Sequence, residues 1–150
     1  MQPKTIKVTA IKNGTVIDHI PAGQGVNILS HLKIAKNKIV MLGVNLKSKH
    51  LGKKDLIKIE DKELEPLEID QLAIFAPEAT VNIIRDFELS KKFNVKLPDT
   101  FQNTIKCPNP NCITNQEETD TKFQTVQNKP LKVKCAYCEK IFKQEEIVLK

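Results

Sequence analysis

The sequence has no tryptophan, and its aromatic residues are one tyrosine and six phenylalanines among 150 residues. Stacking of nucleic-acid bases on aromatic side chains therefore has little support. The longest stretch without Asp, Glu, Lys or Arg, from His19 to Leu32, contains a proline and two glycines. A membrane helix needs about 20 apolar residues, and the N-terminus lacks the apolar segment of a secretory signal. We therefore expect a cytoplasmic protein with no membrane partner.

Signatures of catalysis are missing as well. No Walker-type phosphate loop or dinucleotide-binding glycine pattern occurs, and the run at residues 23–25 is too short to count. The three histidines, His19, His31 and His50, have no evident nucleophile beside them. The sequence therefore favours a binding or regulatory protein over an enzyme.

The net charge is positive, because 24 Lys and Arg residues exceed 18 Asp and Glu residues. A charge of +6 favours anionic partners such as phosphates, nucleic acid or an acidic protein surface. Residues 1–98 carry 16 basic and 11 acidic groups, whereas residues 99–150 carry 8 and 7. The excess lies outside the part that holds the cysteines, which argues against a nucleic-acid-binding zinc finger.

All four cysteines, Cys107, Cys112, Cys135 and Cys138, lie in the last 52 residues. Four residues separate the first pair and two separate the second, so each pair can turn back and present two thiolates to one zinc ion. Two disulfides or an iron–sulfur site are the alternatives, but cytosolic thiols stay reduced and common iron–sulfur spacings differ. Because four protein ligands leave no open position, the zinc is expected to be structural and to stabilise a small core.

The pattern of apolar residues predicts an α+β protein with two regions that meet near Pro98. The expected elements are strands at 5–10, 16–20, 38–46, 55–60 and 80–87, and helices at 24–34 and 66–76. Apart from the first short strand, this order is β-α-β-β-α-β. It predicts a split βαβ (ferredoxin-like) antiparallel sheet with two helices on one face. Residues 99–150 are expected to form a small zinc-stapled β domain.

A basic cluster is expected in the N-terminal region. Period-two geometry puts Lys54 and Lys58 on one face of a strand, and residues 91–92, Asp18 and His19 could join them in a narrow sheet. Ammonium groups beside one carboxylate suit the phosphates and sugar hydroxyls of a nucleotide. A solvated basic rim is the alternative, since exposed lysines are common.

The chain resembles the family of aspartate carbamoyltransferase regulatory chains in long motifs that occur in the family's order. These motifs are Ala10–Ala22, Gly52–Glu60, Asp70–Asn82, Cys107–Cys112 and Lys134–Lys140. The resemblance covers nearly the whole chain. It implies a non-catalytic chain that pairs with itself and docks through its zinc domain onto catalytic trimers in pyrimidine synthesis.

In that family the N-terminal domain binds nucleoside triphosphates, with ATP activating and CTP, aided by UTP, inhibiting. The resemblance therefore implies a nucleotide-binding allosteric domain at residues 1–98 and a zinc-binding docking domain at 99–150. Ribose or base would meet Asp18 and Lys58, and the phosphates would meet His19, Lys54 and Lys92. The frame of the base would be Ile11, Val16, Ile84, Phe87 and Leu89, with Asn82 as a further site residue. Positions facing the catalytic chain would be Asn109, Asn111 and Glu139.

The segments 33–38 and 115–130 match the family poorly, and Phe87 stands where another family member carries tyrosine. Asn109 and Asn111 also have an alternative role as turn formers. The alternative for the whole chain is a zinc-ribbon protein that binds nucleic acid through its basic N-terminal region. That protein would show steep salt-dependent binding to DNA or RNA, whereas the family resemblance predicts no nucleic-acid partner.

Overall fold

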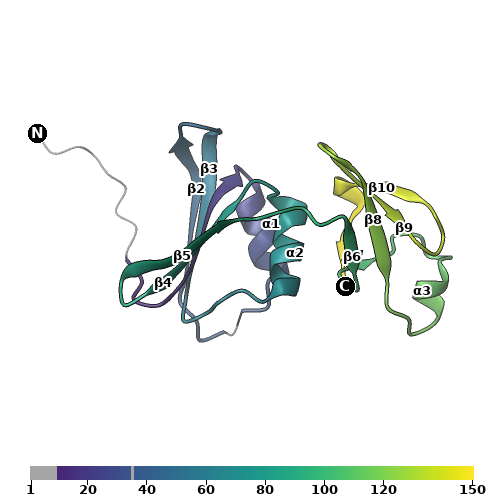
Figure 1. Ribbon diagram of the computed structural model, residues 1–150, viewed down its shortest axis with the longest axis horizontal. Coiled ribbons are helices and arrows are strands. Elements are labelled where there is room, and N and C mark those ends of the chain that lie inside the picture. The colour runs from purple at the N-terminus through teal and green to yellow at the C-terminus, as the bar shows by residue number, and fades with distance from the viewer. Residues whose placement is uncertain (1–9, 35) are drawn as a thin grey trace, which may run out of the picture.

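The computed structural model describes residues 10–34 and 36–150, so the strand expected at 5–10 lies almost entirely outside the described residues. The N-terminal region forms one antiparallel sheet with two helices on one face (Figure 1). Its strands are β1 (Gly14–Pro21), β2 (Val40–Ser48), β3 (Gly52–Glu60), β4 (Thr80–Arg85) and β5 (Glu88–Asn94). Its helices are α1 (Gln24–His31) and α2 (Pro66–Phe75). The spatial order β2-β3-β1-β4-β5 confirms the predicted split βαβ arrangement.

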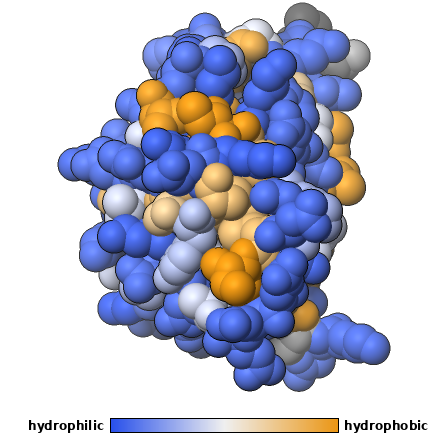
Figure 2. All heavy atoms as spheres, turned by 90° about the vertical axis from the view of Figure 1, so that its right-hand side faces the viewer, coloured by the Kyte–Doolittle hydropathy of each residue, from blue (hydrophilic) through white to orange (hydrophobic). Residues whose placement is uncertain are grey.

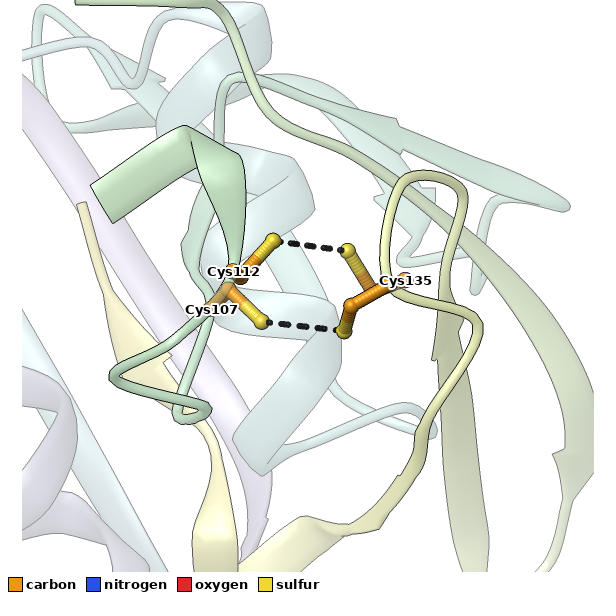
Figure 3. A group of neighbouring side chains, drawn as sticks. Cys107, Cys112 and Cys135 are labelled. Carbon is orange, nitrogen blue, oxygen red and sulfur yellow. Dashed lines mark hydrogen bonds between the residues drawn. The ribbon is translucent and has the colours of Figure 1, made fainter. Parts of the chain in front are cut away.

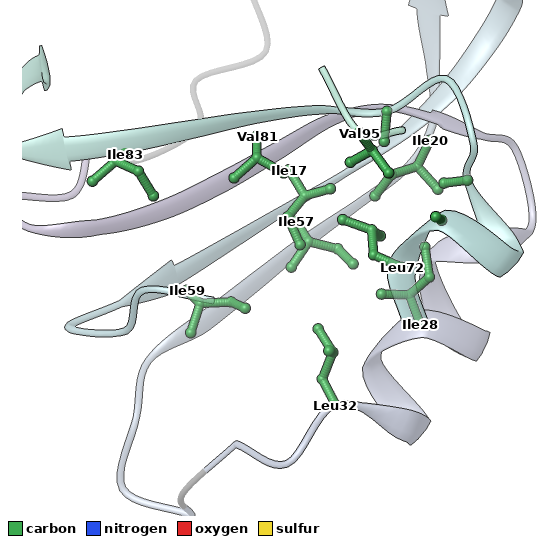
Figure 4. Close-up of a cluster of buried hydrophobic side chains, with 13 residues drawn as sticks. Ile17, Ile20, Ile28, Leu32, Ile57, Ile59, Leu72, Val81, Ile83 and Val95 are labelled. Carbon is green, nitrogen blue, oxygen red and sulfur yellow. The ribbon is translucent and has the colours of Figure 1, made fainter. Parts of the chain in front are cut away.

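The sheet has one buried face and one open face. Alternate residues point to the same side of a strand, so Ile17, Ile57 and Val81 from three neighbouring strands are all fully buried. Figure 4 shows them directed toward Ile28 of α1 and Leu72 of α2. The helices therefore cover one face and leave the other face available to a ligand.

Strand β5 was not expected from the sequence. The segment predicted as one strand over 80–87 divides at Asp86 and Phe87, whose φ angles of 52° and 66° turn the chain back. All but one of the residues of β5 are exposed, so the strand lacks the alternation of apolar and polar residues that would reveal it. Residues 91–92 consequently lie within the sheet instead of after it.

The segment between the strands expected at 38–46 and 55–60 is mostly strand. Strand β2 continues to Ser48 and β3 begins at Gly52, so Lys47, Lys53 and Lys54 lie in the ladder and Lys49 in the turn. The extension fixes the face on which Lys54 lies.

A buried carboxylate ties three of these elements together. Asp55 of β3 is fully buried, and its Oδ2 accepts hydrogen bonds from the backbone N–H groups of Gly23 and Gly25, both at 2.9 Å. Its Oδ1 accepts another from the backbone N–H of Asn45 at 3.0 Å. A Cβ on Gly25 would lie 2.9 Å from this carboxylate, so the close approach requires glycine. Asp55 therefore holds the start of α1 and the irregular part of β2 against β3.

The C-terminal region is a small β structure, as predicted. Strands β6 (Thr100–Gln102), β8 (Lys122–Asn128), β9 (Leu131–Cys135) and β10 (Ile141–Lys143) form a sheet in the order β10-β9-β8-β6. The smaller elements are β7 (Ile105–Lys106), β11 (Val148–Leu149), α3 (Ile113–Gln116) and the 3₁₀ turn η1 (Gln144–Glu146). Strands β7 and β11 pair with each other. None of the helices in the described ranges has the length and apolar content required to cross a bilayer.

The two regions meet at the end of α2. Leu72 and Ala73 pack in the first hydrophobic cluster, but Ile74 is fully buried in the second, together with Phe101 and the cysteines. Gln144 Nε2 donates a 2.7 Å hydrogen bond to the Ile74 carbonyl. The amphipathic pattern that predicts this helix assumes a single buried face, so it does not describe a helix that contacts two cores.

Replacing Asp55 with Asn tests the buried carboxylate. The substitution keeps the volume but puts an NH₂ group against at least one backbone N–H, so we expect it to lower the free energy of unfolding by about 2 kcal/mol. Urea denaturation followed by circular dichroism measures this change. The exposed Asp99→Asn is the matched control, and equal stability of both variants would contradict the assigned role.

Candidate functional site

The four cysteine sulfurs converge on one point. Every pair of Sγ atoms in the group is within 4.8 Å, with 3.7 Å between Cys107 and Cys138 and 3.8 Å between Cys112 and Cys135 (Figure 3). Four sulfurs about 2.3 Å from a tetrahedral ion lie about 3.8 Å from one another. The four predicted ligands are therefore arranged to hold one metal ion with no position left for water.

The first pair of cysteines is carried by a closed turn. The Cys112 N–H donates to the Asn109 carbonyl at 3.1 Å. Asn115 Nδ2 donates to the carbonyls of Cys107 and Asn109 at 2.8 and 2.7 Å. In the second pair, the Glu139 N–H donates to the Cys135 carbonyl at 2.9 Å. These bonds hold the two turns that carry the thiol pairs, which is how outer groups support a metal site.

The thiols differ in acidity. Burial raises the pKa of Cys107 and of Cys135, because the charged thiolate loses its hydration. Burial also acts to raise the pKa of Cys112, but hydrogen bonds with the side chain and backbone of Thr114, together with those to Cys135 and Cys107, lower it to about 7. Thr114 Oγ1 lies 3.2 Å from Cys112 Sγ. Cys112 is thus the thiol of these three that most readily supplies a thiolate ligand.

The nucleotide residues predicted from the sequence fall mainly on the open face of the N-terminal sheet. Lys58 of β3 is paired with Val16 of β1, Val16 with Asn82 of β4, and Asn82 with Lys92 of β5. Paired residues on antiparallel strands project to the same face. Four predicted residues therefore form one row across four strands, opposite the helices.

A second group of predicted residues lies where β1 ends. Lys54 Nζ is 2.8 Å from Asp18 Oδ1, which also accepts the His19 N–H at 2.7 Å. Burial acts to raise the pKa of Asp18, but the hydrogen bond and charge of Lys54 outweigh it and hold that pKa below its usual value. His19 Nδ1 lies 3.1 Å from Thr80 Oγ1. Asp18 is therefore ionised and contacts two nitrogen donors, the Lys54 ammonium group and the backbone N–H of His19.

Most of the residues predicted to frame a base lie on the other side of this row, toward the turn between β4 and β5, whereas Val16 lies within the row. Ile84 is paired with Leu89, and the Phe87 N–H donates to the Lys12 carbonyl at 2.9 Å. Phe87 and Leu89 are 64% and 56% exposed, so their side chains are accessible to a ligand. Ile11 differs, because its side chain is only 5% exposed and any contact to a base would use its backbone.

A hollow of about 530 Å³ opens beside His19, on the side of the row opposite Ile84. Its lining includes two predicted residues, His19 and Lys92, and four polar residues that were not among the predicted nucleotide residues, namely His50, Glu78, Thr80 and Asn94. No motif could have identified the additional residues, because the β2–β3 turn and the unpredicted β5 bring them together.

The residues predicted to face a partner lie on the two cysteine turns. Asn111 and Glu139 are exposed, whereas Asn109 Oδ1 accepts the backbone N–H of Asn111 at 3.1 Å and so also forms the turn. Figure 2 looks at this end of the molecule and shows apolar patches between polar side chains. The exposed large hydrophobic residues of the C-terminal region are Ile113, Val126, Tyr137, Ile141 and Val148.

Comparison with known families matches almost the whole chain. Residues 6–96 match the family described as aspartate carbamoyltransferase regulatory chain, allosteric domain. Residues 99–148 match the family described as aspartate carbamoyltransferase regulatory chain, metal binding domain. The four converging cysteines lie in the second match, so the chain contains a metal-binding domain.

Individual relatives agree with the family matches. A protein of Pyrococcus abyssi is 49% identical over 146 residues, which cover 95% of this chain and 96% of that protein. A protein of Thermococcus onnurineus is 48% identical over 145 residues, covering 95% and 96%. One of Methanothermobacter thermautotrophicus is 43% identical over 148 residues, covering 97% and 95%. Each is named aspartate carbamoyltransferase regulatory chain.

Replacing Thr114 with Val tests the support of the metal centre. The variant removes the hydroxyl beside Cys112 Sγ at nearly constant volume, so we expect metal affinity to fall about tenfold. Competition with a chromophoric chelator measures the affinity. Thr119→Val, in the loop after α3, is the control, and an unchanged affinity in Thr114→Val would remove this residue from the metal centre.

Proposed function

The chain belongs to the family of aspartate carbamoyltransferase regulatory chains, and we propose that it is the non-catalytic, allosteric subunit of that enzyme. It acts in the cytoplasm on pyrimidine synthesis. The observation that carries the proposal is the agreement between family membership over the whole chain and two separate sites within it. One is a cationic sheet face, and the other is a closed four-cysteine centre.

The N-terminal region, residues 1–98, binds nucleoside triphosphates on the open face of its sheet. ATP activates, and CTP, aided by UTP, inhibits. The row that contains Lys58 and Asn82 receives the sugar, and Asp18 offers a carboxylate to its hydroxyls. His19, Lys54 and Lys92 receive the phosphates, and the accessible end near Ile84 and Leu89 receives the base. The support is the placement of these groups on one surface.

The C-terminal region, residues 99–150, binds one structural zinc ion and docks on the catalytic chain. Four thiol ligands in a tetrahedral arrangement suit zinc, and the bound ion would supply folding energy to a region with a small core. The docking surface includes the cysteine turns with Asn109, Asn111 and Glu139. Two copies of the chain pair, and such dimers join catalytic trimers.

Linkage explains how binding at one site changes the activity of another chain. A nucleotide that binds one quaternary state more tightly than the other shifts the equilibrium between the two states. The size of the shift is the difference between the two binding free energies, typically about 1–3 kcal/mol. ATP and CTP carry the same phosphates and differ in the base. Opposite effects therefore require the contacts to the base, near Ile84 and Leu89, to differ between the two quaternary states.

The nucleic-acid alternative loses its support here. That alternative rested only on the positive charge and the four cysteines. Both features belong to a family of regulatory chains, so they no longer favour a nucleic-acid-binding protein. The basic residues then serve a small anionic ligand.

Replacing Lys58 with Ala tests the nucleotide row. Loss of a charge-assisted contact to the sugar or base is expected to weaken both ATP and CTP about tenfold. Isothermal titration calorimetry on the metal-bound chain measures the two affinities. Lys53→Ala, on the same strand and of opposite parity, is the control. Binding of both nucleotides at wild-type affinity by Lys58→Ala would exclude Lys58 from the site.

A further inference from the structure

His50, in the turn between β2 and β3, has no role in the site described so far. We propose that it contacts the terminal phosphate of a bound nucleoside triphosphate and thereby reads the length of the phosphate chain. This inference rests on the proposed function, because it assigns a further ligand contact at the same site. It adds to His19 and Lys92 a residue from a turn that is remote from both in sequence.

The turn between β2 and β3 places the His50 side chain beside His19. The exposed ring of His50 lies edge-on to His19, with ring centroids 6.2 Å apart and planes at 63°. Both rings line the hollow of about 530 Å³ that also receives Lys92 from β5. Three nitrogen-bearing side chains from three different parts of the sheet thus converge on one concave surface.

The length of a nucleoside triphosphate matches the distance between the base-binding residues and the hollow. Ile84, at the base end, and Thr80, at the hollow, are four residues apart on β4, or about 13 Å along a strand. An extended nucleoside triphosphate spans this length. With its base near Ile84 and its sugar at the row of Lys58 and Asn82, its last phosphate reaches the hollow beside His50.

The charges around the hollow carry the third step. His19, His50 and Lys92 line it with a single carboxylate, Glu78, among the described lining residues. Glu78 Oε1 lies 3.7 Å from Lys129 Nζ in an exposed ion pair, which reduces its repulsion of an anion. The neighbouring Asp18 is already paired with Lys54. The donors therefore outnumber the acidic groups where the terminal phosphate would lie.

The test is calorimetric titration of the full-length, metal-bound chain with AMP, ADP, ATP and inorganic tripolyphosphate. His50→Ala is expected to weaken ATP and tripolyphosphate about threefold to tenfold, ADP less, and AMP not at all. His50→Lys keeps a nitrogen donor at this position and is expected to bind ATP near the wild-type level. Lys49→Ala removes a neighbouring charge that does not line the hollow and is expected to have no effect on ATP affinity.

Each contrary result has a distinct meaning. Equal losses for AMP and ATP in His50→Ala, or ATP binding by His50→Lys as weak as that of His50→Ala, would show a packing role and overturn the inference. A loss in Lys49→Ala as large as that in His50→Ala would reduce the effect to overall charge and overturn it too. Unchanged ATP binding by His50→Ala, with normal wild-type binding, would overturn this inference alone. Failure of the wild-type chain to bind any of the four ligands would overturn the proposed function with it.

Discussion

Helix α2 contributes buried side chains to two hydrophobic cores, and this shared packing connects the N-terminal and C-terminal regions. Its Leu72 and Ala73 pack under the N-terminal sheet, whereas Ile74 is buried among the aromatic and cysteine residues of the C-terminal region. The hydrogen bond from Gln144 to the Ile74 carbonyl fixes the contact. A close-packed helix cannot shift in one core without disturbing the other. A displacement of the helix in one region is therefore transmitted to the packing of the other region.

The same connection leads directly to the proposed ligand site. Five residues after the end of α2, β4 begins at Thr80, which lies beside His19 and lines the hollow. Glu78, within this short link, also lines the hollow and pairs with Lys129 of the C-terminal region. A ligand that moves this link would also move the C-terminal region, because Glu78 and Ile74 contact Lys129 and Gln144 there. Linkage between distant sites requires a physical connection of this kind.

The sequence predicted those features that depend on local spacing. The two cysteine pairs identified the metal ligands because turns of fixed length carry them, and period-two spacing identified Lys54 and Lys58 as neighbours on one face of a strand. Features set by tertiary pairing were missed. Strand β5 carries almost no buried residue, and the hollow at His50 exists only because the β2–β3 turn and β5 meet at one end of the sheet. The role of Ile74 was hidden for the same reason.

The most direct test of the account is aspartate carbamoyl transfer by the cognate catalytic trimer, measured across aspartate concentration with and without this chain. The account predicts that responses to ATP and CTP appear only when the zinc-loaded chain is present and disappear after the zinc is removed. Nucleotide responses of the trimer alone would contradict it. So would the absence of any association or response with the zinc-loaded chain.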